Sequence, residues 1–211
     1  LGVLALMSVI RLIVGADSAV AWFERMQSAS TPTGALLMLY SFTALGLGFI
    51  AATRLLLRRR AQTLFGPVPR LLRDFVTAAG IVFLLYGLSL VAWSQSFDAL
   101  MNLDYSLWLS FLPIALLGVL VQTGAEELAF RGYLQQGLAA RFKSPLVWLV
   151  LPSLLFGMGH YMPQEAGDNA WLIVAGATLY GMLMADLTAR SGSLGPAIAV
   201  HFVNNVWALV I

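Results

Sequence analysis

The sequence predicts an all-α fold, a polytopic bundle of about seven transmembrane helices. Of the 211 residues, 60% are hydrophobic and 10% are charged, whereas soluble domains carry about 25% charged residues. The mean hydropathy is +0.84. The apolar residues stand in long unbroken runs, unlike the short alternating segments of a membrane β-barrel. These observations exclude a soluble globular fold and predict one integral membrane domain over residues 1–211.

Seven apolar stretches are the predicted spans, since a transmembrane helix needs roughly 20 apolar residues. They cover residues 1–15, 34–57, 75–93, 107–122, 146–159, 170–187 and 194–211. The first lacks a basic leading segment and is therefore interpreted as a span rather than a signal peptide. The fourth is expected to continue as one long helix over residues 107–140, with kinks at Pro113 and Gly118. Pairs of glycines in the second and sixth stretches are expected to permit close helix approach; they are Gly46 with Gly48, and Gly176 with Gly181.

The charges of the connections predict the topology. Alternate connections are basic, and they carry Arg54, Arg58, Arg59, Arg60, Arg70 and Arg73, then Arg141 and Lys143, then Arg190. The others carry Asp17 and Glu24 with Arg25, then Asp98 and Asp104, then Glu165 and Asp168. The positive-inside rule places the N-terminus and the basic connections in the cytoplasm. One lysine against eleven arginines is typical of a high-GC bacterium, so a bacterial inner membrane is expected. Segment 58–73 is interpreted as a stop-transfer anchor, with contact to anionic lipid headgroups as the alternative.

Four ionisable residues lie within the apolar stretches instead of at their ends: Glu126, Glu127, His160 and His201. An ionisable group at the bilayer centre costs at least ~2.5 kcal/mol on insertion scales, and it normally faces the protein interior and has a function. One such residue could be a satisfied interhelical hydrogen bond. Four of them, including both histidines of the chain, predict a functional site.

The spacing of these residues on helices predicts which of them act together. Glu127 and Arg131 are four residues apart and can pair directly. Glu126 projects about 100° around the helix from Glu127 and stays available for chemistry. His201 and Asn205 also share a helix face. Phe156 shares a face with His160 and is interpreted as a packing wall, and Asn204 is interpreted as an interhelical hydrogen-bonding residue.

These groups suit the activation of a water molecule. The chain has no cysteine, so a thiolate nucleophile and a cysteine-ligated metal are excluded. The His-Glu-x-x-His, Gly-x-Ser-x-Gly and Gly-x-Gly-Asp patterns are absent, and Ser193 is interpreted as a helix cap. Glu126 is therefore the candidate general base, assisted by His160. His201 and Asn205 are the candidate hydrogen-bond donors to the oxyanion of a tetrahedral intermediate.

Three motifs occur in order on successive apolar segments: Glu126-Glu127-x-x-x-Arg131, Phe156-x-x-x-His160 and His201-x-x-x-Asn205. Together they resemble the CPBP family of intramembrane proteases, which includes the type II, Rce1-like CAAX prenyl endopeptidases and proteins linked to bacteriocin self-immunity. The resemblance implies a protease core over about 107–211 and a cavity within the membrane, open toward the cytoplasmic leaflet. It implies that Glu126 and His160 activate water, that His201 and Asn205 form the oxyanion site, and that Glu127 and Arg131 organise the motif helix.

The function expected from these observations is an intramembrane endopeptidase that acts on membrane-associated or lipidated peptide and protein substrates. Glutamate-dependent hydrolysis without an obligatory metal is favoured, and zinc or another divalent metal held by Glu126, His160 and His201 is the alternative. A transporter or proton channel and a non-catalytic scaffold or immunity protein are the rival functions. The expected partners are membrane lipid and the substrate, with no nucleic acid, and the sequence does not predict the oligomeric state.

Overall fold

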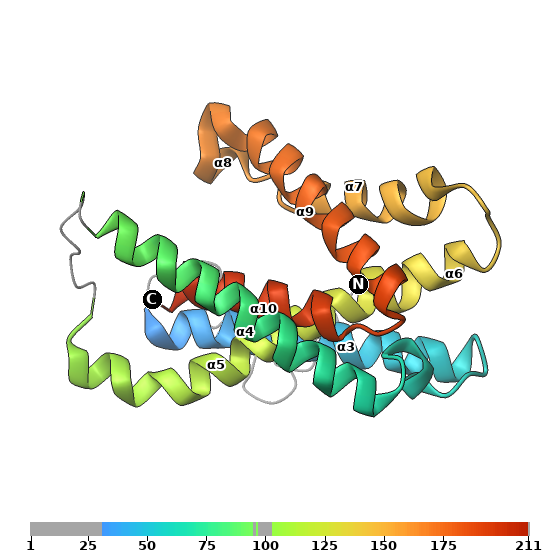
Figure 1. The fold of residues 1–211 in the computed structure, drawn as a ribbon, viewed down its shortest axis with the longest axis horizontal. Helices are drawn as coiled ribbons and strands as arrows, with labels where there is room; N and C mark the ends of the chain where they lie inside the picture. Colours follow the sequence, from blue (N-terminus) through green and yellow to red (C-terminus); the bar gives the residue numbers. More distant parts are fainter. Residues whose placement is uncertain (1–30, 95, 97–102, 211) are drawn as a thin grey trace, which may run out of the picture. The chain divides into compact units, whose positions relative to one another are not determined.

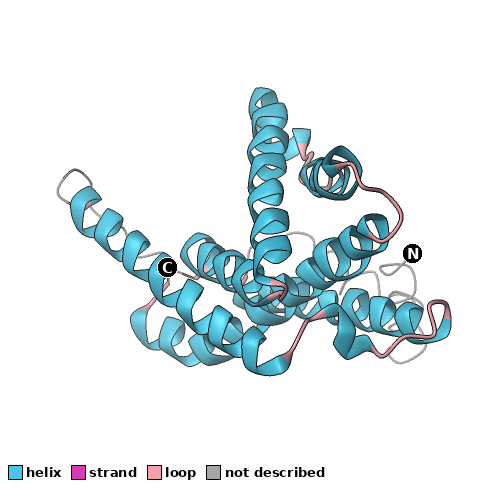
Figure 2. Ribbon diagram, turned by 45° about the vertical axis from the view of Figure 1, so that its right-hand side comes forward, coloured by secondary structure: helices cyan, strands magenta, loops and turns pink. Residues whose placement is uncertain are grey.

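The computed structural model describes residues 31–94, 96 and 103–210, and every regular element within them is helical (Figures 1 and 2). In chain order the elements are α3 (Pro32–Leu55), η1 (Ala61–Leu64), α4 (Val68–Trp93), α5 (Tyr105–Glu127), η2 (Leu128–Gln135), α6 (Gln136–Ala139), η3 (Leu146–Val150), α7 (Leu151–Met158), α8 (Pro163–Ala166), η4 (Gly167–Asn169), α9 (Ala170–Ser191) and α10 (Gly195–Leu209). The predicted all-α membrane helical bundle is confirmed. The first predicted span, residues 1–15, lies outside the described residues.

Four helical stretches in the described part of the chain are long and apolar enough to cross a membrane: Pro32–Leu55, Ala61–Trp93, Tyr105–Ala139 and Pro163–Ser191. They correspond to the predicted second, third, fourth and sixth spans. Leu146–Met158 is a shorter apolar helical stretch, and α10 has 15 residues, so both fall short of the roughly 20 residues of a full span. The long fourth helix is confirmed, because α5, η2 and α6 follow one another without a break.

The chain divides into two compact units, and three of the long helices contribute to both. Of the described residues, the first unit contains 31–50, 81–94, 96, 103–126 and 201–210, and the second contains 51–80 and 127–200. The core of the first unit joins Leu39 of α3, Val119 of α5 and Val206 of α10. A Cβ built on Gly118 would lie 3.2 Å from the Leu39 Cβ atom, so α3 and α5 approach closely at this glycine.

The second unit is built around the pair α7 and α9. A Cβ built on Gly157 would meet the Thr178 side chain and the Val174 carbonyl, so a side chain at position 157 would separate these helices. Leu64 and Leu194 are fully buried in the same unit, 1% and 0% exposed, and both pack against Gly132. The predicted capping role of Ser193 is confirmed, because its Oγ accepts a hydrogen bond from the Gly195 amide at the start of α10.

Two short segments of the second unit, η2 and η3, are π-helical. The first begins directly after Glu127 and carries Arg131. A π-helical turn is wider than an α-helical turn, and such turns are frequent at functional sites. The motif helix therefore changes its winding between its two glutamates and the residues that follow them.

Candidate active site

Glu126 lies in the last turn of α5, in the first unit, and is 9% exposed. The Gln122 side chain, one turn earlier on the same helix, donates from Nε2 to Glu126 Oε1 over 3.0 Å. The second carboxylate oxygen, Oε2, is buried and accepts no hydrogen bond within the described residues. Gln122 therefore fixes the orientation of the carboxylate, and Oε2 keeps lone pairs that no described residue uses.

His201 of α10 faces that oxygen. Its Nε2 atom lies 3.6 Å from Glu126 Oε2, and the histidine is 3% exposed. This separation is longer than a good hydrogen bond, but it places an imidazole edge beside the carboxylate oxygen. The first unit thus brings together two of the predicted catalytic residues.

Asn205, one turn after His201, joins the same polar network through Gln122. Asn205 Nδ2 donates to Gln122 Oε1 over 2.9 Å, so Gln122 connects α5 and α10. Asn204 Nδ2 donates to Asn205 Oδ1 over 3.2 Å, and Tyr86 of α4 donates from its hydroxyl to Asn204 Oδ1 over 2.7 Å. The interhelical hydrogen bond predicted for Asn204 is therefore present.

The network uses only one of the two Asn205 amide protons. An amide nitrogen carries two donors, and one of them points to Gln122 Oε1. The first unit therefore brings a carboxylate, an imidazole and an amide from two helices into one polar network around Gln122.

Glu127 and Arg131 form the ion pair that their spacing predicts. Arg131 Nη1 lies 3.0 Å from Glu127 Oε1, and the side chains of Arg131 and Glu127 are 1% and 0% exposed. Arg131 Nη2 also donates to the carbonyl of Gly181 in α9 over 3.0 Å. Removing one partner of a buried pair typically costs about 3–5 kcal/mol, because the other charge stays buried alone. The pair therefore holds the motif helix to α9 within the second unit.

His160 belongs to the second unit and lies in the turn that follows α7, and not within a helix as its apolar surroundings had predicted. Its Nδ1 atom is 2.9 Å from the Phe156 carbonyl. A carbonyl only accepts, so this hydrogen bond places a proton on Nδ1 and leaves the Nε2 lone pair available in the neutral ring. The His160 ring packs on the Phe156 ring with centroids 4.7 Å apart, and Arg131 Cζ lies 4.7 Å from the same Phe156 centroid. The interpretation of Phe156 as a packing wall agrees with these contacts.

The predicted site residues thus fall into two groups, one in each unit. Glu126, His201 and Asn205 form the first group, and Glu127, Arg131 and His160 form the second. The cooperation of Glu126 with His160 stays a prediction. Gln122 and Tyr86 were missed by the sequence reasoning. The available signal for Gln122 was its place one helical turn before Glu126 in an apolar run, whereas Tyr86 offered none.

The part of the chain that carries both groups is similar to known proteins. The family model described as "Type II CAAX prenyl endopeptidase Rce1-like" matches residues 106–207, the part of the chain that carries both groups. A protein of Bacillus subtilis (strain 168), "Uncharacterized protein YyaK", is 34% identical over 107 residues, which cover 50% of this chain and 35% of that protein. The chain therefore spans about a third of the length of this relative. No solved structure matches the chain.

Proposed function

Because residues 106–207 match the family model of the Rce1-like type II CAAX prenyl endopeptidases, we propose that this integral membrane protein is an intramembrane endopeptidase in which Glu126 activates the attacking water. The observation that carries the proposal is the state of the Glu126 carboxylate. One oxygen is held by Gln122, and the other is buried beside His201 without a hydrogen bond in the described residues. A general base needs an oriented lone pair of this kind.

The reaction is hydrolysis of a peptide bond. A water molecule gives a proton to Glu126 Oε2 while its oxygen attacks the carbonyl carbon of the substrate. The resulting tetrahedral intermediate carries a negative oxygen, which the remaining Asn205 amide proton and the His201 Nε2–H stabilise. The intermediate collapses when the C–N bond breaks and the leaving nitrogen takes the proton from Glu126. Removal of one oxyanion donor typically lowers the rate about 10²–10³-fold.

His160 assists this step in the proposal. Its Nδ1 proton is directed to the Phe156 carbonyl, so its Nε2 atom can accept a hydrogen bond from a water molecule. Phe156 packs between the His160 ring and the Arg131 guanidinium. The Glu127–Arg131 pair thereby positions His160 through Phe156 and does not itself take part in the chemistry.

We propose that no metal is obligatory. A carboxylate bound to a metal ion cannot easily serve as the general base as well, and the proposal gives Glu126 the role of the base. Hydrolysis is expected to continue after treatment with a chelator; activity that disappears with the chelator and returns with zinc would contradict the proposal.

The proposed substrates are membrane-associated or lipidated peptides and proteins, since a site built on spanning helices meets its substrate at the membrane. The Rce1-like family description names CAAX prenyl endopeptidases, and prenylated C-terminal peptides are accordingly the first substrates to try. The proposed location is a bacterial inner membrane, with the basic connections in the cytoplasm.

The test compares the membrane peptides of cells that express the wild-type protein, Glu126→Gln or Glu165→Gln. Glu126→Gln keeps the size of the side chain and removes the base, so its cleavage products should fall to the level of cells without the protein; general-base catalysis is typically worth about 10²–10⁴-fold. Glu165 is an exposed residue of α8, and Glu165→Gln controls for expression and for the loss of one negative charge. Identical products with wild type and Glu126→Gln would refute the proposal.

A further inference from the structure

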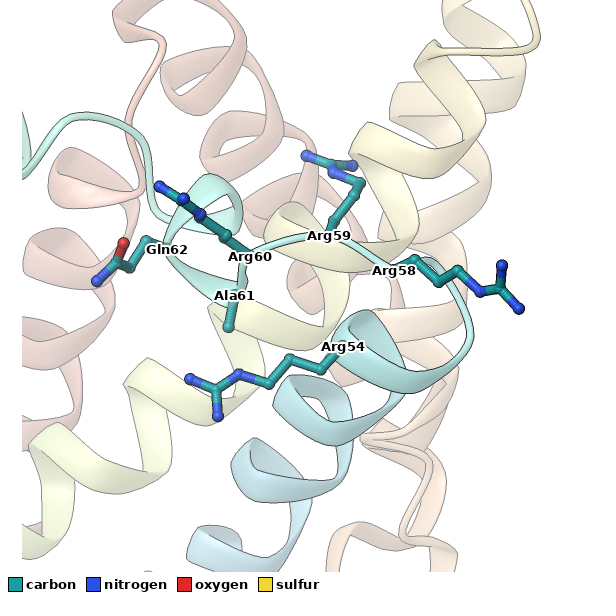
Figure 3. A pocket seen from close by; sticks show the side chains of 6 residues that line it. All are labelled: Arg54, Arg58, Arg59, Arg60, Ala61 and Gln62. Carbon is teal, nitrogen blue, oxygen red and sulfur yellow. The ribbon is translucent and has the colours of Figure 1, made fainter.

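Four arginines line one pocket next to the C-terminal end of α3. The pocket has a volume of about 500 Å³ and is lined by Arg54, Arg58, Arg59, Arg60, Ala61 and Gln62 (Figure 3). Figure 3 shows the arginine side chains spreading outward from the segment, with Arg54 and Arg60 reaching toward the side of Gln62. The pocket lies in the second unit, and the proposed peptidase mechanism uses none of its residues.

No carboxylate in the described part of the chain forms an ion pair with these arginines. Among the described residues, the ion pairs of arginine with an acidic side chain involve Arg73, Arg131 and Arg190. In the pocket, Arg59 Nη2 donates to the neutral Thr63 hydroxyl over 3.0 Å. Four positive charges therefore stand within seven residues of sequence, and they favour a ligand with more than one negative charge.

The backbone that carries the arginines is held in place. Arg58 has φ +50°, a left-handed conformation that a non-glycine residue adopts at a cost and keeps only when its surroundings impose it. Two residues of η1, Ala61 and Leu64, are buried. The Leu64 carbonyl accepts a hydrogen bond from Gln136 Nε2 over 2.8 Å. The backbone of this segment is therefore fixed, and only the exposed arginine side chains have to become ordered on binding, which limits the entropy lost.

The position of the pocket along the chain indicates the kind of ligand. Leu55 and Leu56, the residues just before it, are 76% and 75% exposed, and Leu55 ends a helix that is apolar enough to span a membrane. Exposed leucines suit the acyl region, and the arginines that follow them then stand at the level of the lipid headgroups. Guanidinium groups bind phosphate oxygens with paired hydrogen bonds. We propose that this pocket binds the phosphate groups of anionic phospholipids.

The experiment measures binding of phosphatidylglycerol and of phosphatidylcholine to the purified protein in a neutral detergent, by native mass spectrometry. The test variant combines Arg58→Asn, Arg59→Gln and Arg60→Gln; asparagine is chosen at position 58 because it tolerates the left-handed backbone. Wild type should prefer phosphatidylglycerol. The variant should lose at least about tenfold in affinity for it, because each arginine near a membrane surface contributes roughly fivefold.

The matched control removes the same charge from arginines that have partners elsewhere. It combines Arg70→Gln, Arg73→Gln and Arg190→Gln, whose side chains contact the Ser191 carbonyl, Asp74 and Asp186. The control should keep the preference for phosphatidylglycerol. An equal loss in both variants would show attraction by total charge alone and would overturn the proposal.

Two further arms complete the test. Inorganic phosphate at millimolar concentration should not displace the lipid; displacement would assign the pocket to a free phosphate and contradict the lipid. Should the test variant fail to fold, a variant that combines Arg58→Lys, Arg59→Lys and Arg60→Lys keeps the charge and removes the paired hydrogen bonds. This second variant should bind phosphatidylglycerol more weakly than wild type, and unchanged affinity would contradict the guanidinium site.

Discussion

Gln122 is the side chain that joins the two helices of the first-unit site. It donates to Glu126 and accepts from Asn205, so a single amide orients both the proposed base and a proposed oxyanion donor. Gln122→Leu should leave both groups free to turn. Because small misplacements of reacting groups can cost on the order of 10²-fold, we expect kcat to fall by about that factor.

Three measurements separate positioning by Gln122 from a general loss of folding. The variant should keep KM within about threefold, since the lost hydrogen bonds act after substrate binding. Gln122→Glu, which keeps the shape but places a second carboxylate beside Glu126, should not restore the rate at neutral pH. Gln62→Leu changes an exposed glutamine and should be as active as wild type. An unchanged kcat for Gln122→Leu would remove its positioning role.

Asn204 and Asn205 are neighbours with different predicted roles. Asn205→Ala removes a donor to the developing oxyanion and should lower kcat about 10²–10³-fold. Asn204→Ala removes the bond from Tyr86 on α4 and should act mainly on stability, by about 1 kcal/mol. The measurement is kcat and thermal unfolding of both variants beside Tyr86→Phe. Equal losses of kcat for Asn204→Ala and Asn205→Ala would contradict the separate roles predicted for the two side chains.

At the scale of the helices, the i, i+4 spacing of polar residues correctly predicted a side-chain pair. The i, i+4 pattern predicted the Glu127–Arg131 pair, and the structure has it. The same pattern could not distinguish α-helical from π-helical winding after Glu127, because both keep apolar residues on one broad face. It also could not show that α7 ends at Met158, before His160. A helix end within an apolar run is set by tertiary packing, and local propensity carries little of that information.

The sequence also could not show which glycine of a pair permits close approach of two helices. Variants of the α9 pair test this point. In α9, a Cβ on Gly181 would lie 3.1 Å from Ser153 Cβ and 3.2 Å from Arg131 Nη2, whereas a Cβ on Gly176 would meet nothing within 4 Å. Only one glycine of the pair therefore serves close approach. Gly181→Ala should destabilise the protein by about 1–3 kcal/mol through overpacking. Gly176→Ala should be neutral or stabilising by up to about 1 kcal/mol, because alanine is the better helix former.

Thermal unfolding of the two variants in detergent measures this difference, with wild type scanned at the same rate. The midpoint should fall for Gly181→Ala and stay level or rise for Gly176→Ala. The Gly181 carbonyl also accepts from Arg131, so Gly181→Ala should reduce the peptidase rate as well. Equal midpoints for the two variants would contradict the packing of α9 against Ser153 and Arg131.

For the whole molecule, composition was sufficient to predict the fold class. A chain that is 60% hydrophobic and 10% charged has few ways to satisfy its backbone other than membrane helices. The three motifs were sufficient to predict a resemblance to the family whose model matches residues 106–207. The hydrogen bonds from Gln122 to Asn205 and from Tyr86 to Asn204 join residues 83 and 118 positions apart. Such contacts depend on the rotation of each helix about its axis, and hydropathy does not determine that rotation.

The last prediction concerns the orientation of the molecule in the membrane. The basic connections should face the cytoplasm by the positive-inside rule, so the segment with Lys143 should lie inside and the segment with Gln164 should lie outside. The chain contains no cysteine, and a single introduced cysteine is therefore the only thiol to label. Lys143→Cys and Gln164→Cys replace exposed residues.

In right-side-out vesicles from a bacterial host, a membrane-impermeant maleimide should label Gln164→Cys at once and Lys143→Cys only after permeabilisation. The reverse order of labelling would invert the topology and would place the arginine pocket at the outer leaflet. Labelling of both cysteines before permeabilisation would exclude a membrane-spanning path between these two segments.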